Sequence, residues 1–183
     1  MNFIPQRLRA SPDPPADTPV RRAVSAGDWG LLLIRLTFGL LMAGHGAQKL
    51  FGIFGGDGLT TTANNLAALD YRPGKVYAVI GGVSELLGGL GFAVGLFTPL
   101  AASALIGVMI SAMATVTAAH GVWVTDGGLE YNLSIAVVAL GVAATGPGKL
   151  ALDHPFRWGR GGWPEAVLAL LLGGIGAAVV LLL

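Results

Sequence analysis

Six ionisable side chains lie inside or at the edges of long apolar stretches of this sequence. A charge at the middle of a bilayer costs about 2.5–3.5 kcal/mol on insertion scales, so such residues usually face the protein interior and find partners there. A buried carboxylate, amine and imidazole that lie close together can hold a polar ligand and exchange protons with it. The candidate ligand-binding residues are Arg35, His45, Lys49, Glu85, His120 and Glu130.

Four of these residues fall in the first two apolar segments. His45 and Lys49 are four positions apart and therefore share a face of a helix, and Arg35 falls within the same half of that helix. Glu85 is the single charge of the next segment and lies roughly 15 Å from its start, near the bilayer midplane. A carboxylate at that depth needs a cation or a proton, and we expect either Arg35 or His45 to reach it.

The remaining two residues lie on either side of one connection. His120 ends the third apolar segment and Glu130 opens the fourth, so antiparallel spans place both at the level that Lys49 reaches. We expect these three residues and His45 to form an outward-facing polar pocket, connected through Glu85 and Arg35 to the bilayer centre. Alternatively, Lys49, His120 and Glu130 extend into water at the membrane interface and are purely structural.

The elements that position these side chains are apolar enough to cross a bilayer. Of the 183 residues, 54% are hydrophobic and 11% are charged, whereas soluble chains carry roughly a quarter charged residues. Windows of about 19 residues predict spans over residues 29–51, 76–98, 100–119 and 131–146, and a fifth, only just long enough, over 166–183. The predicted fold is all-α, a polytopic membrane four-helix bundle followed by a fifth, C-terminal transmembrane helix.

The same composition excludes several classes of protein. A net charge of +1 provides no basic field for nucleic acid. The chain has no cysteine, which excludes thiol redox chemistry, a disulfide scaffold and iron–sulfur clusters bound by thiolates. We therefore expect the lipid bilayer as the surrounding medium, no nucleic-acid partner, no metal site and no intrinsic cofactor.

Basic residues predict the orientation of the chain. The arginines of the first 28 residues, together with Lys149, Arg157 and Arg160, fall on one side, and only Arg72 and Lys75 fall on the other. Because basic loops stay in the cytoplasm, we expect a multi-pass protein of the bacterial cytoplasmic membrane with a cytoplasmic N-terminus. Residues 1–28, rich in proline, are expected to form a disordered cytoplasmic tail. Residues 29–154 then form the bundle, and residues 155–183 a linker and an apolar helix.

Small residues recur along the second predicted helix at alternating steps of three and four, namely Gly81, Ser84, Gly88, Gly91 and Gly95. Small side chains let two helix backbones approach closely in lipid. We interpret this stripe as packing within the chain and leave a homodimer open as the alternative.

Other patterns in the spans are weaker. His45 and His120, near one level on different helices, are an alternative axial pair for a b-type haem. Ser103, Ser111, Thr115 and Thr117 in the third span are expected to hydrogen-bond to the backbone of their own helix.

Several of these residues form a pattern that resembles the DoxX family of small bacterial membrane proteins, over about residues 29–154. The most specific feature is His-Gly-x-x-Lys on the first helix combined with a glutamate before paired glycines on the second. The matching positions are Arg35 and Gly39, His45-Gly46-x-x-Lys49-Leu50, Glu85 with Gly88-Gly89, Gly95-Leu96-Phe97-Thr98, Gly146-Pro147-Gly148-Lys149 and Leu152-Asp153.

The resemblance implies a four-helix membrane bundle and a loosely defined function. The family takes its name from a subunit of thiosulfate:quinone oxidoreductase, and its members occur in membrane oxidoreductase assemblies and in responses to quinone or thiol stress. It implies a quinone-interacting subunit in which Arg35, His45, Lys49 and Glu85 face the ligand, while a soluble or membrane oxidoreductase partner supplies electrons. Whether the chain is itself an enzyme stays open. The alternatives are a noncatalytic membrane anchor or scaffold, and a small proton-coupled transporter of a stress metabolite with Glu85 as its proton site.

Overall fold

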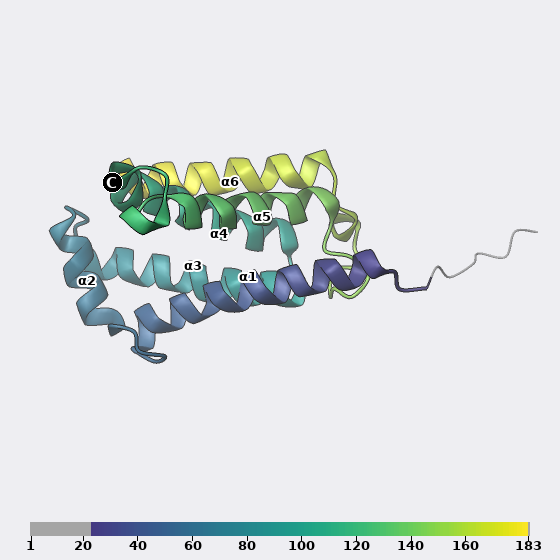
Figure 1. The fold of residues 1–183 in the computed structure, drawn as a ribbon, viewed down its shortest axis with the longest axis horizontal. Coiled ribbons are helices and arrows are strands. Elements are labelled where there is room, and N and C mark those ends of the chain that lie inside the picture. The colour runs from purple at the N-terminus through teal and green to yellow at the C-terminus, as the bar shows by residue number, and fades with distance from the viewer. Residues whose placement is uncertain (1–22, 183) are drawn as a thin grey trace, which may run out of the picture.

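The computed structural model describes residues 23–182. This part of the chain is built from helices, without strands, and Figure 1 shows the long helices side by side with a shorter helix across one end. The helices are α1 (Ala26–Phe51), α2 (Gly58–Ala68), α3 (Gly74–Val94), α4 (Thr98–Ala112), α5 (Glu130–Thr145) and α6 (Trp163–Leu182). A π-helical turn (Met113–Thr117) and a 3-10 turn (Ala118–His120) extend α4, and further 3-10 turns lie at Val124–Asp126 and Arg157–Arg160.

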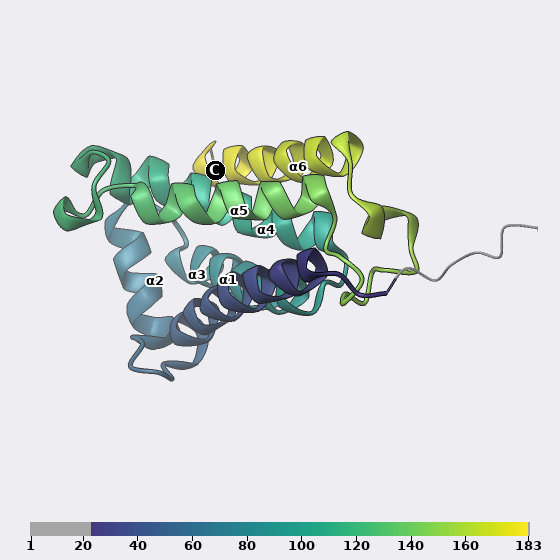
Figure 2. The same cartoon turned by 45° about the vertical axis from the view of Figure 1, so that its right-hand side comes forward.

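The long helices form two layers. Helices α1 and α3 pack together in one layer, and α4 packs against α5 and α6 in the other (Figures 1 and 2). Helix α2 runs across the end at which α1 stops and α3 starts, and contacts both. We call this end the α2 end and the other, where α1 begins, the amino-terminal end.

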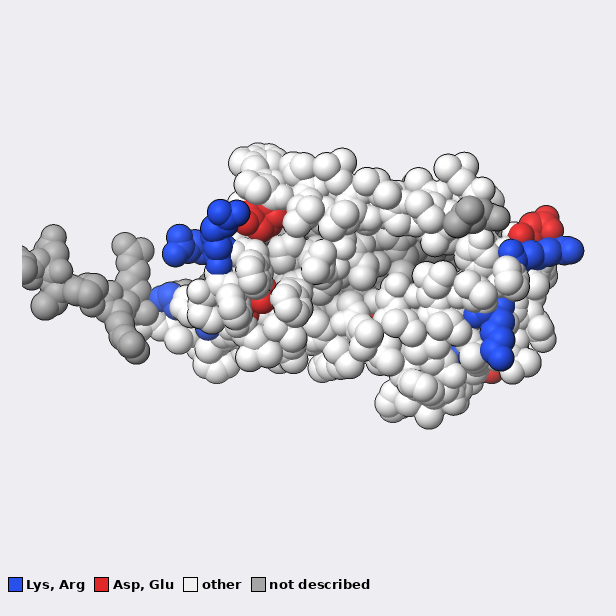
Figure 3. Space-filling model, turned by 180° about the vertical axis from the view of Figure 1, so that it is seen from behind, with Lys and Arg blue, Asp and Glu red and all other residues white. Residues whose placement is uncertain are grey.

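The predicted all-α membrane bundle is confirmed. Four helical segments are long and apolar enough to cross a bilayer, which requires about 20 residues: Ala26–Phe51, Gly74–Val94, Thr98–His120 and Trp163–Leu182. Figure 3 agrees, because on the face it shows the charged side chains gather at the two ends and leave the middle uncharged. The chain is thus a multi-pass membrane protein.

The last two predicted spans differ in how well they meet the length that a bilayer requires. The fourth, α5, has 16 residues and is shorter than the four spanning segments. The predicted marginal fifth, α6, has 20 residues and the highest hydropathy of the spanning helices, 2.4.

Helix boundaries shift where a cap overrides hydropathy. Helix α1 begins at Ala26, before the predicted start, because Ser25 and Asp28 form a reciprocal capping box. Residues 1–22 of the predicted tail lie outside the described residues. Helix α3 ends at Val94, since Gly95 adopts a left-handed conformation with φ of 68°. Helix α2 was not predicted, and none of its residues is buried.

Glycines set the contact between α1 and α3. A Cβ on Gly39 would lie 2.6 Å from backbone atoms of Gly89 and Ala93, and one on Gly46 would lie 2.6 Å from the carbonyl oxygen of Gly82. Real side chains do not tolerate such distances, so the two backbones are in direct contact. This seam differs from the predicted stripe.

The predicted stripe has two roles. Gly88 and Gly91 pack against Ala101 of α4, as expected for packing within the chain, whereas a Cβ added to Gly81 would meet no atom within 4 Å. The stripe therefore faces α4 at Gly88 and Gly91, open space at Gly81, and the Arg35 side chain at Gly95.

Candidate functional site

An ion pair joins α1 and α3 at the α2 end of the bundle. The Nζ atom of Lys49, in the last turn of α1, lies 2.5 Å from Oε1 of Glu85, in the middle of α3. The Glu85 side chain is 3% exposed and that of Lys49 is 40% exposed. The carboxylate is thus buried and compensated by an amine that still reaches solvent. The cation that Glu85 requires comes from the first span, and it is Lys49.

The antiparallel register of α1 and α3 decides this choice. Gly46 of α1 faces Gly82 and Leu86, whereas Arg35 faces Gly95. Gly95 lies ten residues beyond Glu85, about 15 Å along α3 at 1.5 Å per residue. The expected link between Arg35 and Glu85 is therefore wrong, because Arg35 lies too far toward the amino-terminal end.

Arg35 instead belongs to a second polar cluster, which we call the junction: Arg35, the α3–α4 turn at residues 95–98, Leu150 and Asp153. Arg35 is fully buried, donates from Nη2 to the Leu150 carbonyl oxygen at 2.7 Å and interacts electrostatically with Asp153. Asp153 is fully buried too, and its carboxylate accepts from the backbone N–H groups of Phe97 at 2.9 Å and Thr98 at 2.6 Å. It also accepts from Nε1 of Trp158 at 3.0 Å.

The junction has a structural role that its bonds explain. Asp153 caps the start of α4 from a distant segment, because Phe97 at the N-cap position provides no side-chain cap of its own. Arg35 fits only because residue 95 is glycine, since a Cβ there would overlap its guanidinium. The cluster ties α1, the α3–α4 turn and the segment after α5 together.

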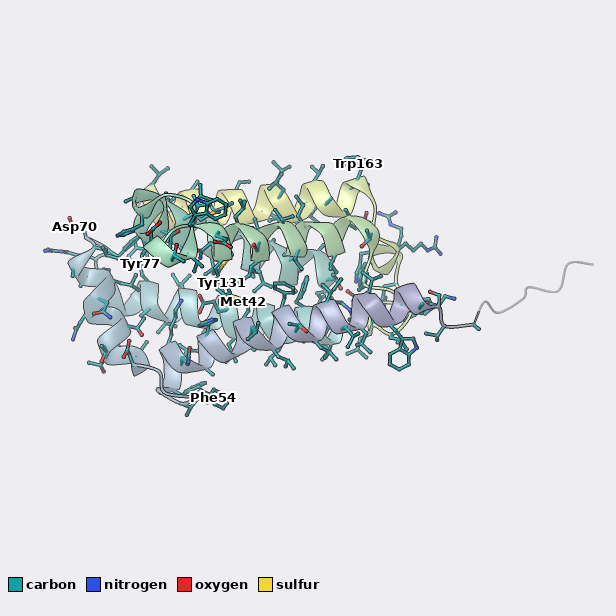
Figure 4. All side chains as sticks on the ribbon, in the orientation of Figure 1. Met42, Phe54, Asp70, Tyr77, Tyr131 and Trp163 are labelled. Carbon is teal, nitrogen blue, oxygen red and sulfur yellow. The ribbon has the colours of Figure 1, made fainter. Side chains whose placement is uncertain are left out.

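His45 connects α1 to α5. Its Nε2 atom lies 3.1 Å from the hydroxyl oxygen of Tyr131, and the two rings meet edge to face with centroids 6.1 Å apart. Figure 4 shows Tyr131 between the layers, near Met42. Tyr131 also interacts electrostatically with Glu85. It was not predicted as a site residue, although it directly follows the predicted Glu130.

His120 and Glu130 do not join this group in the expected way. Nδ1 of His120 bonds to the carbonyl oxygen of Val116 at 2.9 Å, and Oε2 of Glu130 accepts from the backbone N–H of Val124 at 2.9 Å. The α4–α5 connection folds back on itself, with the N–H of Glu130 bonded to the carbonyl of Val122 at 2.9 Å. Its polar side chains are therefore satisfied locally, and the predicted four-residue pocket divides into two parts.

A large cleft of about 500 Å³ opens beside Lys49. Helices α2, α3, α4 and α6 line it, and the face in Figure 3 is hollowed between the two layers. Gly81 and Gly176 leave the space open, because a Cβ on either would meet no atom within 4 Å, and Leu172 and Val180 make the wall of the cleft apolar. Gly107 and Gly173 lie where α4 and α6 are in close contact. Its polar residues include Lys49, Asn65, Tyr77, Ser84, Ser111 and Thr115.

Hydroxyl side chains of the third predicted span bond to the backbone of their own helix and also line the large cleft. Ser103 donates to the Leu100 carbonyl oxygen at 2.7 Å and Thr115 to that of Ser111 at 2.8 Å, which confirms the local bonds predicted for these two residues. The local bond predicted for Thr117 is wrong, because its hydroxyl oxygen is buried without a hydrogen-bond partner among the described residues. Ser103, Ser111 and Thr115 also line the large cleft. These three residues and Gly107 follow one another in steps of four and therefore share one face of the helix. That spacing was the sequence signal that could have predicted their position on the cleft.

A small cleft of about 230 Å³ lies on the other side of Lys49. Most of its lining is polar and comes from the end of α1 and the glycine-rich loop before α2: His45, Gln48, Lys49, Gly55, Gly56, Asp57 and Thr62. Gln48 holds the loop in place by donating to the Phe54 carbonyl oxygen at 3.0 Å, while the Phe54 ring points away from the bundle (Figure 4). Lys49, Asp57 and Thr62 line both clefts.

Among residues 23–182, no group of three or more histidine, cysteine or acidic side chains is placed to hold a metal ion. His45 and His120 each bond to a different neighbour, Tyr131 and Val116.

Comparison with known proteins identifies the family. No curated protein and no solved structure matches the chain significantly. The DoxX family model matches residues 30–118, which run from α1 to the end of the π-helical extension of α4 and include Arg35, His45, Lys49 and Glu85. Helices α5 and α6 follow the matched residues. The chain is a member of the DoxX family.

Proposed function

We propose that this membrane protein binds a membrane quinone in the large cleft and serves as the quinone-interacting subunit of a membrane oxidoreductase system. One observation carries the proposal. A cleft of about 500 Å³, with an apolar wall from α3, α4 and α6, ends at an amine backed by a buried carboxylate. This combination fits an amphipathic ligand with a hydrocarbon tail and an oxygen-bearing head.

The donor set at Lys49 suits a carbonyl oxygen. An ammonium group has three N–H donors, and Glu85 takes one of those of Lys49. The two others are available to oxygen atoms in the cleft. Hydroxyls of Ser84 and Tyr77 on the lining of the same cleft are further donors that can orient a ring carrying two carbonyls.

The chain itself handles protons rather than electrons. Reduction of a quinone to a quinol consumes two electrons and two protons. Lys49 is placed to donate a proton to a carbonyl oxygen, and Glu85 stabilises the ammonium form that donates it. Because the chain has no cysteine for a thiolate-bound cluster, we assign the electrons to a soluble or membrane oxidoreductase partner.

We further propose a bacterial cytoplasmic membrane with the N-terminus in the cytoplasm. Lys149, Arg157 and Arg160 lie at the amino-terminal end of the bundle, and Arg72 and Lys75 lie at the α2 end. The bias toward the amino-terminal end supports a cytoplasmic location for that end. Both clefts then lie toward the outer side of the membrane.

Photo-crosslinking tests quinone binding directly. The purified chain in lipid nanodiscs is irradiated with an azido-quinone, and the labelled peptides are mapped by mass spectrometry. We expect saturable labelling on α3, α4 and α6 that excess unmodified quinone suppresses. Labelling spread over all lipid-facing helices and insensitive to competition would refute the proposal.

Matched variants separate binding from folding. Lys49→Met combined with Glu85→Gln removes both charges together, so neither is left alone in the protein interior, and we expect it to weaken labelling. Lys75→Met changes an exposed lysine at the start of α3 and should label like the parent. Equal labelling of all three proteins would remove Lys49 from the site.

A further inference from the structure

Lys49 lies where two clefts meet. The large cleft and the small cleft share three lining residues, Lys49, Asp57 and Thr62. Of these, Lys49 alone bonds to the buried carboxylate of Glu85. The same ammonium group is therefore reached from two directions.

The two clefts differ in chemistry. Apolar and small residues of three long helices wall the large cleft. Side chains of His45, Gln48 and Asp57 and two loop glycines dominate the lining of the small one. Asp57 is exposed, and the loop next to it has no regular structure. The small cleft thus opens toward water, whereas the large one suits an apolar ligand.

We propose that the small cleft is a water port, through which Lys49 exchanges protons with the aqueous phase while the large cleft holds its ligand. The port stands on the cavity geometry alone, and the identity of the ligand rests on the proposed function. The inference assigns a role to Gln48, Asp57 and the loop between α1 and α2.

The proton balance is simple. When an N–H bond of Lys49 breaks and an O–H bond forms on the acceptor oxygen in the large cleft, Lys49 becomes a neutral amine beside the Glu85 carboxylate. The pair then carries one net negative charge, which favours uptake of a proton from water in the small cleft. That uptake restores the ammonium group, and no other reactant is consumed.

The charged and titratable groups around Lys49 are consistent with uptake of a proton from water by its neutral amine. His45 lies on its own helix, Glu85 and Tyr77 on α3, and Asp57 next to α2. The faces contributed by α4 and α6 to the large cleft carry hydroxyls and apolar groups, with no charge among the described lining residues. The acidic groups nearby favour return of the proton to the amine.

Chemical labelling tests the port. The chain has no cysteine and only three lysines, Lys49, Lys75 and Lys149, so both thiol and amine chemistry are site-specific. Gln48→Cys places a thiol in the small cleft, and the matched variant Ser84→Cys places one in the large cleft. Each is blocked with a bulky polar thiol reagent in nanodiscs. Lys49 is then labelled with a sulfonated, water-soluble amine reagent and compared with exposed Lys75 in the same molecules.

Blocking at residue 48 should slow aqueous labelling of Lys49 by about tenfold or more, because labelling tracks the fraction of time the amine is open to water. The reference for the blocked protein is unblocked Gln48→Cys, so any effect of the substitution itself cancels in the comparison, and blocked against unblocked His45→Cys repeats the test on the same cleft. Blocking at residue 84 should have little effect. No effect at residue 48, or an equal effect at residue 84, overturns the water port.

A lipid-soluble amine reagent separates the two proposals. Quinone should protect Lys49 from this reagent, which approaches through the large cleft, and leave aqueous labelling unchanged. If quinone gives no protection while the block at residue 48 still acts, the port stands and quinone binding fails. If quinone protects and the block does nothing, binding stands and the port fails.

Discussion

Removing Lys49 should cost more stability than removing Glu85, although the two residues form one pair. The reason is their unequal burial, since the Glu85 side chain is 3% exposed and the Lys49 side chain 40%. Lys49→Met leaves a carboxylate buried without a cation, and loss of one partner of a buried pair costs about 3–5 kcal/mol. Glu85→Gln leaves an ammonium that still reaches water, and we expect a cost of about 1 kcal/mol.

A double-mutant cycle measures the coupling. The double variant Lys49→Met, Glu85→Gln should be close to Glu85→Gln alone, because no charge is then left unpaired. The coupling free energy between the two sites then equals the cost of Lys49→Met alone, about 3–5 kcal/mol. Unfolding in mixed micelles of mild detergent and dodecyl sulfate, followed by circular dichroism, gives the free energies, with Lys75→Met as the control.

The pH dependence provides a second, independent readout. Lowering the pH neutralises the orphaned carboxylate of Lys49→Met by protonation, so the deficit of this variant relative to the parent should shrink. The deficit of Glu85→Gln should not shrink in this way, because no lone carboxylate remains at the site. Additive single-variant effects, or a Lys49→Met deficit that is independent of pH, would refute the unequal-burial argument.

Two further predictions concern packing and the junction. Gly46→Ala should destabilise the bundle by about 1–3 kcal/mol, the range for overpacking, because the added Cβ would overlap the backbone of Leu86. Gly44→Ala is the control and should be neutral, because a Cβ there meets no atom within 4 Å. Unfolding free energies in mixed micelles compare the two variants. Asp153→Ala should cost about 3 kcal/mol or more, since it removes the α4 cap and leaves a buried arginine uncompensated, whereas Asp126→Ala in an exposed turn should change thermal stability little.

The sequence was sufficient to predict features that depend on local chemistry. Apolar runs identify the spans, and a lone acid such as Glu85 in such a run must be buried with a cation. The four-residue step from His45 to Lys49 places both near the α2 end, where each bonds to a different helix. These features follow from periodicity and from the energy of a charge in hydrocarbon.

Register could not be predicted in the same way. The choice between Arg35 and Lys49 as the partner of Glu85 depends on how far α1 slides along α3, and the backbone contacts of Gly39 and Gly46 fix that position. With 29 glycines in the chain, sequence does not single out the few that touch another backbone. Most of the stripe that the spacing favoured faces α4 or open space instead, and only Gly95 among its glycines meets a side chain of α1, Arg35.

Hydrogen bonds within the loops were the second feature that could not be predicted from the sequence. His120 and Glu130 fall at the expected ends of their helices, but turns between them satisfy both side chains. Helix α2 is short and has no buried residue, so no apolar pattern marks it. Both clefts nevertheless depend on α2 or the loop before it, because Asp57 and Thr62 line each of them.

The matched family region alone does not complete the site. Residues 30–118 contain the ion pair and most of both clefts, but Tyr131 of α5 provides the bond to His45, and α6 closes one wall of the large cleft. That wall consists of Gly173, Gly176 and Ala177 flanked by larger apolar residues. Since small residues determine how much space the cleft retains, the ligand that fits beside Lys49 depends on α6 as much as on the residues that define the family.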